Sequence, residues 1–160
     1  MTIIFETENF LVRPAEFPLI DRDDGGHITI DPKFAVSTRQ QLSPKQSIEL
    51  MRLIAVTGEA MTNVMQRNGV DIGRINYQDN GNWSVYRSGG PQLHYHLYGR
   101  ARNAVIQPYG QSLYFPHKDD AAGFYTNNKS LTEDDTKGIR DEIIRLLLQK
   151  KYADAEWRLC

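Results

Sequence analysis

The sequence predicts an α+β domain, in which strands form an antiparallel sheet and helices pack beside it. Three observations support this class: short extended segments follow one another through turns, one capped helix interrupts them, and a second amphipathic helix lies near the end. With 160 residues, 40% of them hydrophobic, the chain is long enough to bury a core. We expect a single domain spanning residues 1–160.

Composition argues against several classes of protein. Nineteen Lys and Arg residues balance 20 Asp and Glu residues, giving a formal charge of -1, so broad contact with a nucleic-acid backbone is not expected. No run of residues reaches membrane-spanning length and no targeting signal is visible. The only cysteine is Cys160, which excludes an intrachain disulfide and cysteine-based zinc sites and fits a cytoplasmic location.

The N-terminal segment, residues 1–20, predicts irregular strands. Ile3–Phe5 and Phe10–Val12 are short apolar stretches, and two prolines follow them. A glycine-rich turn then leads into His27–Pro32, where polar and apolar residues alternate. This alternation predicts a half-buried strand that ends at its proline.

Three residues predict the start of a long helix. Ser43 is suited to the N-cap, Pro44 to the first helical position, and Gln46 to closing a capping box, while Gly69 supplies the stop. Apolar residues then recur at helical spacing and predict a buried stripe: Ile48, Met51, Ile54 or Ala55, Met61, and Val64 or Met65.

Further strands are expected after this helix. Val70–Gln78 predicts a strand, Asp79–Asn82 a turn, and Trp83–Arg87 another extended piece. More extended pieces are expected at 92–98, Val105–Ile106 and Leu113–Phe115.

Residues 117–160 are expected to form a C-terminal extension. The sequence is polar up to Ser130, which together with Glu133 offers a second capping box. Apolar residues at helical spacing predict an amphipathic helix over about 131–151.

The most informative stretch is Gln92-Leu93-His94-Tyr95-His96-Leu97-Tyr98, which holds two of the four histidines. Successive side chains of an extended strand point to opposite faces. Gln92, His94, His96 and Tyr98 therefore share one face, and the intervening apolar residues share the other.

Two imidazoles on one face of a strand leave three interpretations open. They are polar residues in a satisfied hydrogen-bond network, or two ligands of a metal ion, or a nucleophile and its assistant. A metal site needs further ligands, and no acidic residue follows His96 within ten positions. In nucleophilic catalysis one ring attacks an electrophilic phosphorus while its neighbour handles a proton or the departing oxygen.

Four motifs occur in order between about residues 20 and 102: Gly25-Gly26-His27-Ile28-Thr29-Ile30-Asp31-Pro32-Lys33, then Leu42-Ser43-Pro44, then Ile75-Asn76, then Gln92-Leu93-His94-Tyr95-His96-Leu97-Tyr98-Gly99-Arg100. Together they resemble the histidine triad (HIT) family of nucleotide hydrolases and transferases. The resemblance implies a HIT-like antiparallel sheet with one long helix packed on it, a homodimer, and a nucleotide or dinucleotide substrate. It implies no cofactor and no metal.

Carried onto this sequence, the resemblance implies that His94 is the nucleophile and that His96 contacts the scissile phosphate region. Gln92 stands in place of the first histidine of the triad. In the family the main-chain carbonyl at that position orients the nucleophile, and Gln92 has the same carbonyl. The other nucleotide-binding residues that the resemblance implies are His27, Asn76, Ser88, Gly89, Asp21 and Ile28.

The resemblance implies an enzyme that acts at the α-phosphorus of a nucleoside phosphoanhydride or phosphoramidate, through a nucleotidyl intermediate on His94. A dinucleoside polyphosphate such as diadenosine tetraphosphate and adenosine phosphoramidate are both expected substrates. The alternative is a nucleotide-binding or sensing protein in which Gln92 marks weakened catalysis.

Overall fold

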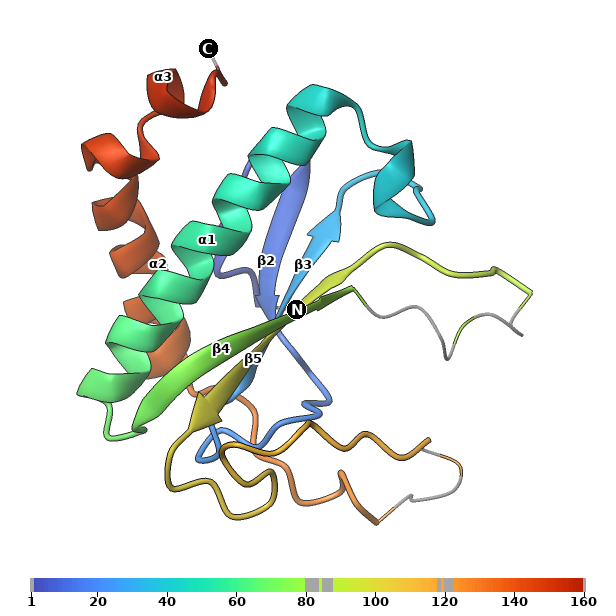
Figure 1. Ribbon diagram of the computed structural model, residues 1–160, viewed down its shortest axis with the longest axis vertical. Coiled ribbons are helices and arrows are strands. Elements are labelled where there is room, and N and C mark those ends of the chain that lie inside the picture. Colours follow the sequence, from blue (N-terminus) through green and yellow to red (C-terminus); the bar gives the residue numbers. More distant parts are fainter. Residues whose placement is uncertain (1, 80–83, 85–87, 118, 120–122, 160) are drawn as a thin grey trace.

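The computed structural model describes residues 2–79, 84, 88–117, 119 and 123–159. Within them, five strands form one antiparallel sheet in the order β1-β2-β3-β5-β4 (Figure 1). The strands are β1 (Phe5–Glu6), β2 (Phe10–Pro14), β3 (His27–Pro32), β4 (Ile72–Asp79) and β5 (Tyr95–Ala101). The predicted α+β class is confirmed, with the helices packed beside the antiparallel sheet.

The pairing of β3 with β5 separates the two faces of the sheet. His27 lies opposite Tyr98, whereas the neighbouring pair, Ile28 with Leu97, points to the other face. The apolar face belongs to the main core beneath the helices. We call the other face, which carries His27, His96 and Tyr98, the histidine face.

The long helix α1 (Pro44–Arg67) begins as predicted. The Ser43 hydroxyl accepts a hydrogen bond from the Gln46 backbone N–H at 3.2 Å, and the Gln46 side chain accepts from the Ser43 N–H at 2.9 Å. The predicted apolar stripe was partly wrong, because Ile48 and Met51 are 36% and 55% exposed. Ile54, Met61, Val64 and Met65 are buried as predicted, and the face toward the core also includes Leu50, Leu53, Val56 and Ala60.

The C-terminal helix α2 (Glu133–Leu147) begins two residues later than the predicted capping box. Thr132 is the N-cap and exchanges hydrogen bonds with Asp135 at 2.9 and 3.1 Å, so the expected role of Ser130 was wrong. The helix ends before the expected residue 151, and a 3-10 helix, η3 (Lys150–Tyr152), and a short helix, α3 (Asp154–Trp157), follow.

The helices α1 and α2 lie side by side (Figure 1). Gly138 of α2 permits this approach, because a Cβ atom there would lie 2.9 Å from a methyl carbon of Val64. Asn63 donates to the buried Glu142 carboxylate at 2.8 Å. None of the helices within the described residues combines the length and the apolar character required to span a bilayer.

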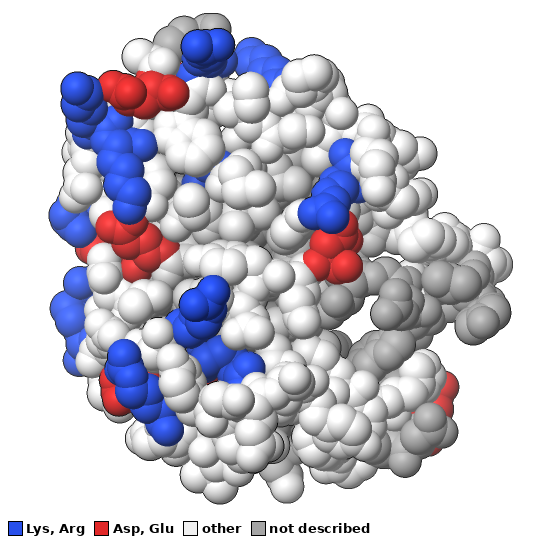
Figure 2. All heavy atoms as spheres, in the orientation of Figure 1, with Lys and Arg blue, Asp and Glu red and all other residues white. Residues whose placement is uncertain are grey.

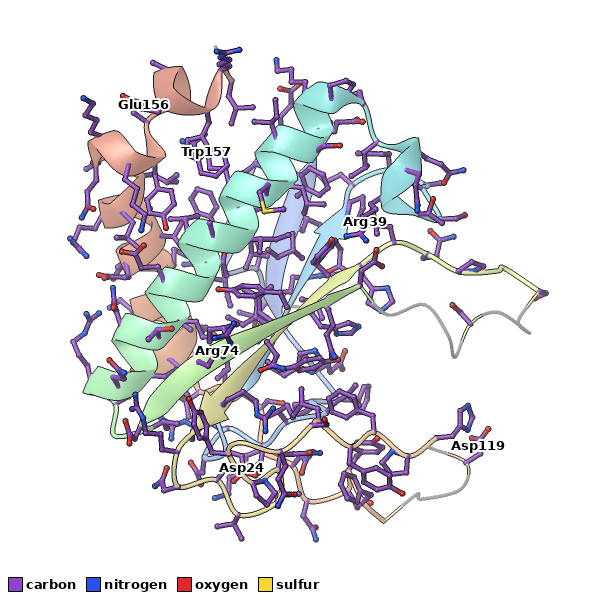
Figure 3. All side chains as sticks on the ribbon, in the orientation of Figure 1. Asp24, Arg39, Arg74, Asp119, Glu156 and Trp157 are labelled. Atoms are coloured by element: carbon purple, nitrogen blue, oxygen red, sulfur yellow. The ribbon has the colours of Figure 1, made fainter. Side chains whose placement is uncertain are left out.

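The segment after β5 is irregular, and the strands expected at Val105–Ile106 and Leu113–Phe115 were wrong. Its backbone is held by the buried Asp24 carboxylate, which accepts three successive N–H groups of residues 105–107 at 2.7 to 2.8 Å. Figure 3 shows Asp24 among these loops, below the end of β5. The predicted turn at Asp79–Asn82 and extended piece at Trp83–Arg87 lie outside the described residues, apart from Asp79 and Ser84.

Candidate active site

His94 lies just before β5, where the main chain is fixed on its N-terminal side. The Leu93 N–H donates to the Val36 carbonyl at 2.8 Å. The His94 Nδ1 lies 2.8 Å from the Gln92 carbonyl oxygen. Because a carbonyl only accepts, Nδ1 must carry a proton, and in the neutral ring the lone pair is then on the other ring nitrogen, Nε2. This is the orienting hydrogen bond that the resemblance implied for Gln92.

His27 and His96 form a buried pair on the histidine face. The Leu19 backbone N–H donates to His27 Nδ1 at 3.2 Å, so the proton of the neutral His27 ring is on Nε2. That Nε2 lies 2.8 Å from His96 Nδ1, which must then accept. The proton of the neutral His96 ring is therefore on its own Nε2, where it is available as a hydrogen-bond donor.

Burial keeps both rings of this pair uncharged. His27 is 3% exposed and His96 is 7% exposed. Burial, reinforced by the neighbouring His94, lowers the pKa of His96 to about 3. The pKa of His27 is lowered well below its usual value by burial first, and then by His96 and His94. In the free protein the pair is neutral at physiological pH, as the assignment of protons requires.

Two glycines bring the loop before β3 against β5 and so place His27 beside His96. Gly25 and Gly26 adopt φ angles of 136° and 81°, a region that favours glycine. A Cβ atom on Gly99 would lie 2.1 Å from the Gly25 carbonyl oxygen, and the Gly99 N–H donates to Gly26 at 3.0 Å. The Gly-Gly-His sequence is thus required by the close approach of two backbones.

Aromatic rings surround the pair. Tyr98 is fully buried and stacks on His96 with ring centroids 5.2 Å apart and planes 9° apart. It also contacts His27 at 4.6 Å. On its other side His96 meets the edge of His94 at 4.6 Å. The rings therefore follow one another along the chain, from His94 just before β5 to His96 and Tyr98 within it.

The predicted phosphate-contacting residues lie in different surroundings. Asn76 is opposite Tyr98 in the pairing of β4 with β5, and so it belongs to the histidine face. Ser88 and Gly89 form an exposed turn on the way to β5. The Gln92 side chain is exposed as well. The roles expected for these side chains remain predictions.

Gln78 is a candidate that the sequence analysis did not single out. It is directly opposite His96 in the same strand pairing, closer in register than Asn76. Its Oε1 atom is buried and has no hydrogen-bond partner among the described residues. Counting two residues on from Asn76 would have placed Gln78 on the same face.

Two predicted site residues are used elsewhere. Ile28 is fully buried in the core on the helix-covered face, and its expected place in a nucleotide pocket stays a prediction. Asp21 is buried, and its two carboxylate oxygens accept the N–H groups of Asp23 at 2.8 Å and Lys129 at 2.7 Å. Asp21 therefore ties together two loops, and its expected ribose contact stays a prediction.

The described residues contain no group of three or more His, Cys, Asp and Glu side chains placed to hold a metal ion. Within the buried pair, His27 Nε2 and His96 Nδ1 already bond to each other. In the neutral rings the remaining nitrogens are His94 Nε2, with a lone pair, and His96 Nε2, with a proton.

Comparison with known proteins gives a match in structure alone. No protein-family model matches the sequence, and no curated protein matches it. A hypothetical histidine triad nucleotide-binding protein from Sulfolobus tokodaii has 16% identity and a TM-score of 0.59, over 91% of this chain and 85% of that one. A Hit-like protein from Bartonella henselae, involved in cell-cycle regulation, has 13% identity and a TM-score of 0.56, over 88% of this chain and 84% of that one.

A Zn-bound histidine triad family protein from Mycobacterium smegmatis has 16% identity and a TM-score of 0.52, over 91% of this chain and 87% of that one. At these identities the likeness concerns the fold, and it extends over nearly the whole chain. The chain has the fold of histidine triad proteins.

Proposed function

We propose that this protein is a nucleotide hydrolase or transferase that acts at the α-phosphorus of a nucleoside phosphoanhydride or phosphoramidate. The observation that carries the proposal is the hydrogen bond from His94 Nδ1 to the Gln92 carbonyl, at 2.8 Å. It fixes the ring, and in the neutral tautomer it places the lone pair on Nε2, which is what a nucleophilic imidazole requires.

In the first step the lone pair of His94 Nε2 attacks the α-phosphorus. A P–N bond forms, the bond from phosphorus to the leaving oxygen or nitrogen breaks, and the leaving group keeps that electron pair. A leaving nitrogen also takes up a proton from water and departs as ammonia or a neutral amine. His96 donates a hydrogen bond from its Nε2–H to the charge that develops on the leaving group. It is not a general acid in the free protein, because burial lowers its pKa to about 3 and so keeps the ring neutral.

In the second step water, or another acceptor, attacks the phosphorus of the nucleotidyl-histidine. The P–N bond breaks, its electron pair returns to His94 Nε2, and with water as acceptor a nucleoside monophosphate and a proton are released. Asn76, Ser88 and Gly89 are proposed to contact the phosphate oxygens, with Gln78 as a further candidate beside His96.

The test compares two histidine variants. Wild-type protein, His94→Ala and His117→Ala are incubated with diadenosine tetraphosphate and with adenosine phosphoramidate. Release of nucleoside monophosphate is followed, and the adenylylated protein is sought by mass spectrometry. His94→Ala should lose turnover by roughly a thousandfold or more, together with the covalent adduct. His117 lies outside the cluster and half-buried in a loop, so its variant should behave like wild type.

Retained turnover in His94→Ala would refute the proposed role of His94 as the nucleophile. Tight nucleotide binding by the wild type, with neither release nor adduct, would instead favour the nucleotide-sensing alternative. Unfolding curves for the three proteins separate loss of chemistry from loss of fold.

We also propose a homodimer that pairs through β4. This strand is last in the sheet order, so within the described residues no strand pairs with its outer side. A hollow of about 360 Å³ lies beside it, lined by residues of α1, β4 and η3. Figure 3 shows Arg74 of this strand beside α1. Light scattering measures the molar mass of the protein in solution, and the mass of a monomer would overturn the proposed homodimer.

The cytoplasmic location expected from the sequence remains a prediction.

A further inference from the structure

Asp31 of β3 is a carboxylate on the histidine face. It shares this face with Thr29, because side chains two apart on a strand point the same way, and Thr29 is directly opposite His96 in the pairing of β3 with β5. The strands β3, β4 and β5 contain one other acidic residue, Asp79, which is opposite Tyr95 and so belongs to the face of the core. Asp31 is therefore the carboxylate that these three strands present beside the histidines.

The main chain places Asp31 level with His94, the proposed nucleophile. Ile30 is opposite Tyr95, and further along the N–H of the residue before His94 donates to the Val36 carbonyl at 2.8 Å. The two segments thus stay side by side past the start of β5, and the position after Ile30 and Tyr95 pairs Asp31 with His94. Cross-strand neighbours have Cβ atoms about 5 Å apart.

One oxygen of the Asp31 carboxylate is held in place and the other is available. Oδ2 accepts hydrogen bonds from Thr29 Oγ1 at 3.0 Å and from Arg13 Nε at 3.1 Å, and it lies 2.9 Å from Arg13 Nη2. Among the described residues, none donates to Oδ1. The carboxylate therefore has a fixed position and keeps an acceptor for a ligand.

An ion pair is in itself an ordinary surface feature, and Figure 2 shows Lys and Arg side chains beside Asp and Glu side chains over the helices. The pair of Arg13 with Asp31 differs in how far it is covered. Its side chains are 25% and 21% exposed, whereas those of the surface pair Arg102 with Asp71 are 53% and 57% exposed. Ligand sites characteristically hold a few fixed polar groups of this kind, which orient the bound molecule.

The sugar of a nucleotide requires such an acceptor. Ribose hydroxyls donate hydrogen bonds, and carboxylates of Asp or Glu accept them in dinucleotide-binding folds. The sequence analysis expected Asp21 to contact the ribose, but both of its carboxylate oxygens already accept backbone N–H groups. Asp31 has an oxygen to offer, and it lies next to the residue that would hold the α-phosphorus, to which the sugar is attached.

We propose that Asp31 accepts a hydrogen bond from the ribose of the nucleotide through Oδ1, and so gives preference to substrates that carry the sugar hydroxyls. This inference rests on the proposed function, because it places the α-phosphorus at His94. Asp31 is then a specificity residue with no part in the chemical step, and Arg13 and Thr29 are positioning residues that hold its other oxygen.

The experiment measures kcat/KM for adenosine phosphoramidate and for its dideoxy analogue, which lacks both ribose hydroxyls. Four proteins are compared: wild type, Asp31→Ala, Asp31→Asn and Asp71→Ala. Asp71 is the matched control, since it also pairs with an arginine, at 2.6 Å, but lies at the end of β5 far from His94. Dissociation constants for adenosine monophosphate and its dideoxy analogue, which need no turnover, are measured on the same proteins.

Wild type should favour the ribose compound by about tenfold or more, the effect of one hydrogen bond to a charged group. Asp31→Ala should bring this ratio close to one, Asp31→Asn should lower it, and Asp71→Ala should keep it. The ratio does not depend on how much of each protein is folded, and Asp31→Asn, which keeps the volume of the side chain, decides if Asp31→Ala does not fold.

A wild-type ratio near one, or a ratio that the Asp31 variants leave unchanged, overturns the inference. If the wild type releases no product, the proposed function fails, and the dissociation constants then decide. A preference for the ribose monophosphate that is lost in the Asp31 variants and kept in Asp71→Ala supports the ribose contact, and any other pattern, including no binding at all, refutes it.

Discussion

Two substitutions at His27 separate its two hydrogen bonds, one to the loop and one to His96. The His27 Nδ1 accepts from Leu19 at 3.2 Å, and its Nε2 donates to His96 at 2.8 Å. An asparagine amide reaches about as far as Nδ1 and a glutamine amide about as far as Nε2. His27→Asn should therefore keep the acceptor for Leu19, and His27→Gln should keep the donor to His96.

The two variants should fail in different ways. In His27→Gln the partly buried Leu19 N–H loses its acceptor, which costs about 1 to 3 kcal/mol of unfolding free energy. In His27→Asn the His96 ring loses the partner that fixes its proton on Nε2. The donor aimed at the leaving group is then lost or misplaced, and removal of one such donor lowers kcat by about a hundredfold or more. His27→Gln should stay within about tenfold of wild type.

The assay combines urea unfolding with kcat for diadenosine tetraphosphate in wild type and both variants. Nitrogen-15 shifts of the His96 ring give a readout that needs no turnover: Nε2 should carry the proton in wild type and His27→Gln, and the two forms should mix in His27→Asn. Equal kcat in the two variants, or an Nδ1-protonated His96 in wild type, would refute the proposed chain of protons.

Three further outcomes are expected. Gln92→Ala should keep kcat within about threefold, because only the main-chain carbonyl of this exposed residue holds His94; a hundredfold loss would show that the side chain matters. Unfolding free energy should fall as pH drops from about 6.5 toward 3, by up to about 1.4 kcal/mol per unit for each of His27 and His96, because both stay neutral when folded and gain a proton when unfolded. Urea titrations at pH 7, 6 and 5 check this, and a flat profile contradicts it. Gly99→Ala should lose at least about 3 kcal/mol of stability, since its Cβ would overlap a facing carbonyl at 2.1 Å, whereas a Cβ on Gly123 meets nothing within 4 Å and Gly123→Ala should be neutral.

The features that the sequence predicted correctly depend on contacts between near neighbours. The start of α1 is decided by Ser43, Pro44 and Gln46, whose bonds span three residues. The face shared by His94 and His96 follows from the period of a strand. These patterns involve only a few consecutive residues, and therefore a single sequence is enough to recognise them.

The sequence-based predictions were wrong or incomplete for features that depend on contacts between residues far apart in the chain. Both Ser130 and Thr132 begin a capping-box pattern, and Thr132 is the N-cap in the structure. Its partner Asp135 also accepts hydrogen bonds from Arg22 at 2.6 and 2.9 Å, and this contact between distant parts of the chain favours Thr132. The pairing of Gln78 with His96 depends on an irregularity near Gly73 and on the loop before β5. No local pattern encodes these distances.

Because residue 92 is a glutamine, the sequence leaves open whether it can orient His94. In the structure His94 is oriented by the backbone carbonyl of residue 92, whatever its side chain. The Gln92 carbonyl can hold His94 only if the main chain around it is fixed, and the bond from the Leu93 N–H to Val36 provides this. Leu93 is itself buried in the core, so the path of the chain is set by packing on the face opposite to the histidines. It follows that the orientation of the nucleophile depends on Leu93 more than on the side chain at position 92. The proposed nucleophile therefore does not require a histidine at position 92.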